Sequence, residues 1–195
     1  MKSNKLIIFL LSIASIIILF IFSFQLDNSI SKAIPSLWNP FLTGFFSIIT
    51  YIGNTNTMIT LGLILFVILV LRKEYRKGII SSVILIFSAG LGELIKFIIQ
   101  RQRPLNSLIQ RTDPSFPSLH ALGSLIFFSL IIYLFKDKIK NKFLKILFIA
   151  VNIILILLIG LSRIYLNVHW FSDVIAGYVL GLIILFFSLR FFDKN

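Results

Sequence analysis

The chain has 195 residues, of which 58% are hydrophobic and 13% are charged, and its mean hydropathy is +1.01. A soluble domain carries about 45–50% apolar and about 25% charged residues, so these values exclude an ordinary water-soluble globule as well as a disordered chain. The absence of cysteine and the presence of only two histidines exclude disulfide frameworks, thiolate zinc sites and a three-histidine metal site. The net charge of +12 would suggest nucleic-acid binding in a soluble protein, but in a membrane protein such a surplus sets orientation.

Six apolar segments approach the length of about 20 residues that a helix needs to cross a bilayer. In chain order they are Leu6–Phe24, Thr57–Leu71, Gly78–Ile99, Ser118–Phe135, Phe143–Leu161 and Val168–Phe192. The first resembles a signal peptide at its start, but no small-residue cleavage site follows, so we expect an uncleaved helix. We predict an all-α fold, a polytopic six-transmembrane-helix bundle, that forms one membrane-embedded domain over residues 1–195.

The stretch Pro35–Asn54 lies between the first two expected spans and is apolar, but it contains two prolines and two glycines. It also contains Trp38, and tryptophan favours the headgroup level of a bilayer. We therefore expect an interfacial helix and loop here, with a packing role rather than a functional one.

Positive charge is shared unevenly between the two ends of the expected spans. One end carries thirteen cations: Lys2, Lys5, Arg72, Lys73, Arg76, Lys77, Lys136, Lys138, Lys140, Lys142, Lys145, Arg190 and Lys194. The other end carries six: Lys32, Lys96, Arg101, Arg103, Arg111 and Arg163. The positive-inside rule then predicts a multi-pass protein of the cell (plasma) membrane with both termini in the cytoplasm. Binding of anionic lipid headgroups is the alternative interpretation of the basic loops.

Three polar clusters interrupt the apolar sequence, and all three fall at the predicted outer end. The first is Lys96–Pro104, the second is Pro117–His120, and the third is Ser162–Asp173. Both histidines of the protein lie inside these clusters, which makes this end the candidate site.

Lys96, Arg103 and Arg163 predict an oxyanion site. A charge inside a membrane span is costly, so Lys96 needs a partner or a task. If its helix continues to Arg103, the two cations point to nearly the same side, because seven residues make about two turns, and Pro104 then ends the helix. Ammonium and guanidinium groups bind phosphate oxygens. Snorkelling to the interface explains any one of these cations, but it explains less well three of them beside two histidines.

The two histidines fit roles in phosphate chemistry. His169 and Asp173 are four residues apart, a spacing that puts both on one face of a helix. A carboxylate bonded to one ring nitrogen fixes the tautomer and makes the other nitrogen a competent nucleophile, although Asp173 would also stabilise the start of a helix. His120, in the first turn of its span, is placed to act as a general acid. Ser118 is the expected N-cap of that helix, and the free N–H groups behind an N-cap suit a phosphate.

Taken together, the motifs Lys-x6-Arg-Pro, Pro-Ser-x-His and Ser-Arg-x5-His-x3-Asp resemble the signature of the type 2 phosphatidic acid phosphatase (PAP2) superfamily. The resemblance implies that His169 takes the phosphoryl group as a phosphohistidine. It implies that Asp173 orients this nucleophile and that His120 protonates the leaving group. The phosphate oxygens would then be held by the second group of site residues, which comprises Lys96, Arg103, Ser118, Leu119 and Arg163.

Leu119 stands where the family commonly has glycine. Leucine keeps the N–H donor if its φ stays negative, but it adds bulk beside the phosphate, and we predict that Leu119→Gly retains activity. Glu93, three residues before Lys96, is expected to be the charge partner of that lysine; a headgroup or proton-relay role is the alternative. The resemblance implies no metal and no cofactor.

The function implied by the resemblance is two-step hydrolysis of a phosphomonoester or diphosphate of a membrane lipid. Undecaprenyl diphosphate is the preferred substrate, with phosphatidylglycerophosphate or phosphatidate as alternatives. A non-catalytic lipid-headgroup binder or transporter, and a phosphotransferase between lipids, are the competing classes. The expected partners are the lipid phosphate substrate and the lipid bilayer, with no nucleic acid, and the sequence leaves the oligomeric state open.

Overall fold

The computed structural model describes residues 21–192, and helices account for most of them. Residues 21–33 are helical and lead into the other elements. These are η1 (Ile34–Leu37), α2 (Pro40–Ile52), α3 (Thr55–Leu71), α4 (Tyr75–Ile99), α5 (Leu119–Phe135), η2 (Lys136–Lys138), α6 (Lys142–Tyr165), α7 (Phe171–Ser188) and η3 (Leu189–Phe191). Within this part of the chain there is no strand, which confirms the all-α prediction.

Four of the described helices are long and apolar enough to cross a membrane: α4, α5 with η2, α6, and α7 with η3. Helices α2 and α3 form a fifth candidate span that is bent by 47° at Gly53 and Asn54. Most of the expected first span, Leu6–Phe24, lies outside the described residues, so the predicted six-helix count is compatible with the structure.

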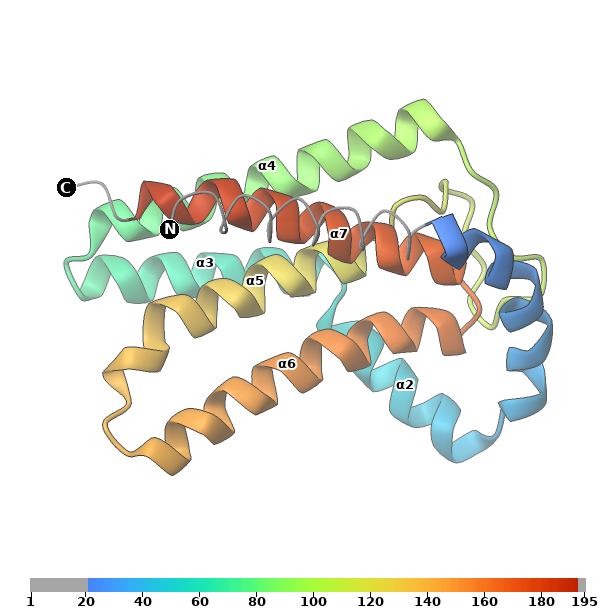
Figure 1. Cartoon of the computed structure of the whole chain (residues 1–195), viewed down its shortest axis with the longest axis horizontal. Helices are drawn as coiled ribbons and strands as arrows, with labels where there is room; N and C mark the ends of the chain where they lie inside the picture. Colours follow the sequence, from blue (N-terminus) through green and yellow to red (C-terminus); the bar gives the residue numbers. More distant parts are fainter. Residues whose placement is uncertain (1–20, 193–195) are drawn as a thin grey trace, which may run out of the picture.

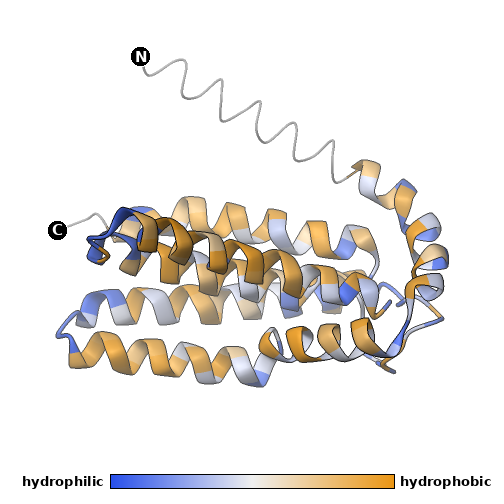
Figure 2. Cartoon of the chain, turned by 90° about the horizontal axis from the view of Figure 1, so that it is seen from below, coloured by the Kyte–Doolittle hydropathy of each residue, from blue (hydrophilic) through white to orange (hydrophobic). Residues whose placement is uncertain are grey.

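The sides of the bundle are apolar and its ends are polar (Figure 2). Phe97, Ile86 and Phe143 are each more than 70% exposed, and many other large apolar side chains share this surface. Water-soluble monomers rarely expose a continuous apolar surface of this kind. The protein is therefore a membrane protein.

Helix α5 is the central element of the bundle. It contacts α3, α4, α6 and α7, and Leu122, Ile126 and Leu130 along it are almost completely buried. Helix α7 approaches the first turn of α5 closely, since a Cβ on Gly177 of α7 would lie 2.6 Å from the carbonyl oxygen of Ser118. The N–H of Ser118 also donates to the carbonyl oxygen of Asp173 at 3.0 Å. These contacts join the second and third sequence motifs.

The bundle has two chemically different ends (Figure 1). The loops 100–118 and 166–170 lie at one of them, which we call the motif end. The loops 72–74 and 136–141 lie at the other, which we call the basic end, and there the carboxylate of Glu74 bonds to Lys138 at 2.5 Å. The structure thus separates the polar motifs from the lysine-rich loops, as the sequence predicts; which end faces the cytoplasm stays a prediction.

The segment Pro35–Asn54, expected to be an interfacial helix and loop, contains most of η1, helix α2 and the bend before α3, and α2 has a packing role. Its place at the membrane interface stays a prediction. Asn39 caps α2, and the side chain of Asn39 accepts from the N–H of Leu42. Helix α2 packs against α6, and just before it the indole of Trp38 donates to the carbonyl oxygen of Tyr165 at 2.8 Å. The anchoring of α2 on α6 also brings Thr50 to the motif end, where it contacts a site residue.

Candidate active site

A polar cavity of about 320 Å³ lies at the motif end. Its walls come from α3, α4, α5, α6 and the two loops, and the lining residues are Thr55, Glu93, Lys96, Arg103, Arg111, Asp113, Leu119, His120, Arg163 and His169. Six of the eight predicted site residues line it. Ser118 and Asp173 do not, because both are fully buried behind its wall.

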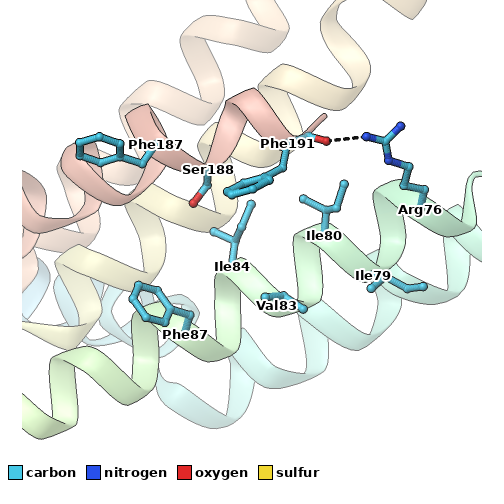
Figure 3. Close-up of a pocket in the computed structure, with 9 residues that line it drawn as sticks. All are labelled: Arg76, Ile79, Ile80, Val83, Ile84, Phe87, Phe187, Ser188 and Phe191. Carbon is cyan, nitrogen blue, oxygen red and sulfur yellow. Dashed lines mark hydrogen bonds between the residues drawn. The ribbon is translucent and has the colours of Figure 1, made fainter. Parts of the chain in front are cut away.

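A larger groove lies toward the basic end, between α4 and the end of α7 (Figure 3). Ile80, Val83, Phe87 and other apolar side chains form its walls. Its single charged group is Arg76, which donates to the carbonyl oxygen of Phe191 at 3.0 Å. The groove contains one hydroxyl, that of Ser188, but no histidine, carboxylate or lysine among the described residues lines it to activate that hydroxyl, so the smaller polar cavity is the candidate site.

Lys96 and Arg103 do not share a helix, and this part of the sequence prediction is wrong. Helix α4 ends at Ile99, because Gln100 takes a left-handed conformation with φ of 50°, and Arg103 lies in the loop that follows. The two cations nevertheless meet on Asp113, whose Oδ2 lies 2.6 Å from Nζ of Lys96 and 2.8 Å from Nη2 of Arg103. A shared carboxylate, not helical phase, brings them together.

Asp113 also replaces the expected partner of Lys96. Glu93 lines the cavity, but it forms no ion pair within residues 21–192. Burial raises the pKa of Asp113, but hydrogen bonds and positive charge from Lys96 and Arg103 outweigh this and hold it well below its usual range. Asp113 is therefore ionised at any physiological pH.

His169 lies in the loop before α7, not on it, because α7 begins at Phe171. The expectation that His169 and Asp173 share a helix face is therefore wrong, yet Nδ1 of the histidine is 3.4 Å from Oδ2 of the aspartate. That distance is long for a hydrogen bond. The carboxylate is held in place by other groups: Oδ2 accepts from the N–H of Trp170 at 2.9 Å, and Oδ1 accepts from Arg101 at 2.7 Å.

The contact between Arg103 and the His169 ring indicates its tautomer, while Nδ1 has no hydrogen-bond partner among the described residues. Nη1 of Arg103 is 3.2 Å from Nε2, and because a guanidinium can only donate, Nε2 is the acceptor. The ring proton then resides on Nδ1, on the side of Asp173. Burial, together with the charges of Arg163 and Arg103, lowers the pKa of His169 well below its usual value. At neutral pH the ring is uncharged and Nε2 keeps the lone pair that a nucleophile needs.

His120 and Ser118 occupy the predicted positions at the start of α5. Ser118 is the N-cap, with its Oγ accepting from the N–H of Ala121 at 3.5 Å, and His120 follows in the first turn. The ring of His120 lines the cavity and forms no hydrogen bond with the described part of the chain, so it is free to exchange a proton with a group bound there. A role for Ser118 in holding phosphate stays a prediction.

Arg163, on the last turn of α6, is a buried cation with an unpartnered donor. Its side chain is 2% exposed, Nη1 donates to Oγ1 of Thr50, and Nε has no hydrogen-bond partner among the described residues. Burying a charged donor without a partner costs free energy, so such groups are normally paired. An oxyanion in the cavity would supply the missing acceptor.

The bulk of Leu119 is accommodated by a glycine on the neighbouring helix. A Cβ on Gly92 of α4 would lie 2.4 Å from Cδ2 of Leu119, so the leucine side chain fills space that a larger residue at position 92 would occupy. Leu119 begins a regular helix and its backbone is unaffected by this packing. The leucine that stands in place of the family glycine is thus accommodated by Gly92 on the neighbouring helix.

Sequence reasoning missed a buried ionic network behind the cavity. Asp27, only 3% exposed, accepts from the N–H of Ser172 at 2.8 Å, from its Oγ at 2.6 Å, and from Arg101 at 2.6 Å. The same arginine holds Asp173, as described above. A carboxylate within an apolar helix needs a partner, and this was the available signal for Asp27.

Clusters of three or more potential metal ligands of the His, Cys, Asp or Glu type do not occur within residues 21–192. The side chains that line the cavity instead comprise four cations, two carboxylates and two histidines. This set is suited to binding an anion and to transferring protons or a phosphoryl group.

Comparison with known sequences gives a family match and two relatives. The sequence profile of the PAP2 superfamily matches residues 77–195. Phosphatidylglycerophosphatase B of Bacillus subtilis is 29% identical over 172 residues, which cover 87% of this chain and 84% of that protein. An undecaprenyl-diphosphatase of Sulfolobus acidocaldarius is 32% identical over 130 residues, which cover 63% of this chain and 59% of that protein.

Two crystal structures share the fold. A transmembrane PAP2-type phosphatidylglycerolphosphate phosphatase from Bacillus subtilis matches with a TM-score of 0.80 and 26% identity, covering 93% of this chain and 96% of the other. LpxE of Aquifex aeolicus matches with a TM-score of 0.67 and 25% identity, covering 85% of this chain and 95% of the other.

Proposed function

The chain belongs to the PAP2 superfamily and is a hydrolase of lipid phosphate esters, and we propose that it works through a phosphohistidine formed on Nε2 of His169. The observation that carries this proposal is the state of that nitrogen. It is an acceptor in a neutral ring, and it lies beside a cavity lined by Lys96, Arg103 and Arg163. A lone pair facing a cationic pocket is what phosphoryl transfer to nitrogen requires.

In the first step the substrate phosphate enters the cavity and Arg103 turns from Nε2 to a phosphate oxygen. Nε2 then attacks phosphorus, the bond from phosphorus to the leaving oxygen breaks, and His120 gives its proton to that oxygen. The cations stabilise the charge on the transferring group, which is the main catalytic task in phosphoryl transfer. Asp173, beside Nδ1–H, stabilises the positive charge that develops on the His169 ring.

In the second step water attacks the phosphohistidine. His120, now neutral, takes a proton from the water as the bond between oxygen and phosphorus forms and the bond between phosphorus and nitrogen breaks. Inorganic phosphate leaves, and Nε2 regains its lone pair. Both histidines thus return to their starting protonation states after one turnover.

For the substrate we propose undecaprenyl diphosphate. Four cations and two carboxylates line a cavity of about 320 Å³, and this surplus of positive charge suits an anionic diphosphate headgroup; one relative is named an undecaprenyl-diphosphatase. Phosphatidylglycerophosphate is the second candidate, because the match to phosphatidylglycerophosphatase B extends over 87% of this chain. Phosphatidate is the third candidate substrate. A transfer of the phosphoryl group to another lipid, in place of water, is the alternative reaction to be tested.

The test is phosphate release by the purified protein from a substrate panel in mixed micelles with a chelator present. The panel holds undecaprenyl diphosphate, phosphatidylglycerophosphate, diacylglycerol diphosphate and phosphatidate. We expect the highest kcat/KM on undecaprenyl diphosphate and no release by His169→Ala. Undiminished release by that variant would overturn the nucleophile assignment, and lipid products that gain phosphate would show a phosphotransferase.

We also propose that the motif end faces the outside of the cell membrane, so that the lipid tail lies in the bilayer and the headgroup enters between helices. The positive-inside rule supports this orientation, because both lysine-rich loops lie at the basic end. A reporter fused after Lys140 is expected in the cytoplasm, and one inserted near Gln110 is expected outside. The opposite pattern would move the site to the cytosol and remove the support for an outward-facing substrate.

A further inference from the structure

Asp113 sits where the two cations of the first motif converge. One oxygen of its carboxylate, Oδ2, accepts both from Nζ of Lys96 at 2.6 Å and from Nη2 of Arg103 at 2.8 Å. A phosphate oxygen held by these two groups would occupy the same position relative to their nitrogens. The carboxylate is therefore an anion already present in the proposed phosphate site.

The burial of the three side chains is unequal. Lys96 and Arg103 are 7% and 9% exposed, whereas the side chain of Asp113 is 45% exposed. Buried cations without a counter-ion are costly, and Asp113 supplies that counter-ion. The carboxylate is half-exposed, so water can solvate it once another anion takes its place on the two cations. Of the three side chains, the aspartate is the one with ready access to water.

The same contact reaches the nucleophile through Arg103. Its Nε donates to the carbonyl oxygen of Asp113 and its Nη2 to the side chain, while Nη1 lies 3.2 Å from Nε2 of His169. In this arrangement one guanidinium both holds the aspartate and occupies the lone pair of His169. The carboxylate therefore occupies the two cations that a phosphate would contact, and one of these cations also contacts the nucleophile.

We propose that Asp113 is a built-in anion that fills the phosphate site between turnovers and is displaced by the substrate phosphate. When the phosphate takes its place on Lys96 and Arg103, the guanidinium shifts and Nε2 of His169 is released for attack. This inference rests on the proposed function of the cavity. It assigns to Asp113 a competition with substrate that is distinct from the roles of the residues that hold phosphate.

The first test uses Asp113→Asn, which keeps the side-chain size and removes the charge. Inorganic phosphate is the probe, and its dissociation constant is measured by thermal shift of the purified protein, a readout that needs no turnover. We expect phosphate to bind about threefold to tenfold more tightly to the variant, since a competing anion has been removed. Equal or weaker binding would overturn the proposal. Weaker binding is what we expect if Asp113 only positions the two cations, because its removal would then disorder the phosphate site.

The matched control is Asp137→Asn at the basic end. Asp137 pairs with Lys145 at 2.5 Å and lies outside the candidate site, so its loss is expected to leave phosphate binding unchanged. Failure of the proposed function has a different signature: inorganic phosphate would then give no shift with the unaltered protein. If phosphate binds the unaltered protein and the Asp113 variant equally, only the present inference fails.

A second test needs no variant and so does not depend on whether Asp113→Asn folds. The carboxylates of the unaltered protein are labelled with a water-soluble carbodiimide and an amine, and the labelled peptides are quantified by mass spectrometry. Saturating inorganic phosphate is expected to increase labelling of Asp113 relative to Asp137 in the same sample, because displacement frees the carboxylate. Labelling that is unchanged or reduced would contradict displacement.

Discussion

Each end of the bundle has a carboxylate that bridges two cations, and the two bridges differ mainly in burial. At the basic end Glu74 contacts Lys77 at 2.7 Å and Lys138 at 2.5 Å, and these lysine side chains are 45% and 31% exposed. At the motif end Asp113 contacts two cations at similar distances, but both cations are less than 10% exposed. Nearly the same charge pattern is thus placed in two different environments.

The difference shows why charge pattern alone does not identify a site. Exposed ion pairs contribute little, because water and salt screen them, so the Glu74 bridge only joins two loops. Both carboxylates are strongly ionised: hydrogen bonds from Lys138 and Lys77 lower the pKa of Glu74 to about 2. Only at the motif end are the cations poorly hydrated, and only there does an arriving phosphate gain much by replacing the resident carboxylate.

The largest expected effect comes from removing one cation at each end. Arg103→Ala should lower kcat/KM by about a hundredfold to a thousandfold, the range seen when one transition-state donor is lost, because it touches both the phosphate site and Nε2 of His169. Lys138→Ala should change kcat/KM less than about twofold. Steady-state kinetics on the best substrate of the panel measures both. Similar losses of kcat/KM in the two variants would mean that the burial of a cation does not determine its importance for activity.

The pH dependence should show a second, smaller difference. Because burial and nearby cations lower the pKa of His169, its Nε2 keeps the lone pair as the pH falls through about 6.5, where an ordinary histidine becomes protonated. After correction for the ionisation of the substrate, kcat/KM at pH 5.5 should be no less than about half of its neutral value, since protonation of the general acid His120 can only raise the rate as the pH falls. A loss of about tenfold at that pH would indicate a histidine with an ordinary pKa.

The contact between Gly92 and Leu119 gives a packing test within the wall of the cavity. Gly92→Ala should destabilise the protein by about 1–3 kcal/mol, because its Cβ would meet Leu119 at 2.4 Å in a packed interface. Gly90→Ala on the same helix is the control, since nothing lies within 4 Å of its Cβ. Thermal unfolding in detergent measures both variants.

Leu119→Gly completes this test, because it removes the side chain that the new methyl group meets. The single variant Leu119→Gly should retain activity. The double variant, which combines Leu119→Gly with Gly92→Ala, should regain most of the stability lost in Gly92→Ala. Equal unfolding temperatures for Gly92→Ala and Gly90→Ala would show that the two helices adjust freely, and the leucine would then not depend on the glycine.

The smallest expected effect is that of Glu74→Gln at the basic end. It breaks three partly exposed ion pairs, with Lys77, Lys138 and, at 3.7 Å, Arg72, and should cost at most about 1 kcal/mol of stability, with less effect at high salt. Its activity should equal that of the unaltered protein. A large loss of activity would mean that the basic end is coupled to the site, and the contrast drawn between the two ends would fail.

The sequence predicted the helical fold and most of the cavity because both depend on local signals. Long apolar runs locate the spans, and the spacing of the three motifs locates Lys96, His120, Arg163 and His169, all of which line one cavity. The N-cap at Ser118 was also predicted, because capping is a property of a short segment.

The remaining features depend on how loops fold in space. The expected span ends at Ile99, as α4 does, but the helical continuation to Arg103 that we considered does not form, because Gln100 takes a left-handed conformation that no sequence pattern marks. The role of Asp113 follows from a loop that returns to α4, and the burial of Asp27 follows from a helix laid across the motif end. These contacts join residues that are far apart in sequence, which local patterns do not record.

The central claim, that His169 carries the phosphoryl group, is tested most directly by trapping the intermediate. Substrate with a radiolabelled phosphate is mixed with the protein, the reaction is stopped within the first turnover in alkali, and the labelled peptide is mapped. We predict alkali-stable, acid-labile label on the peptide with His169 and none in His169→Ala. Label on another residue, or turnover with no covalent label at any time, would contradict it.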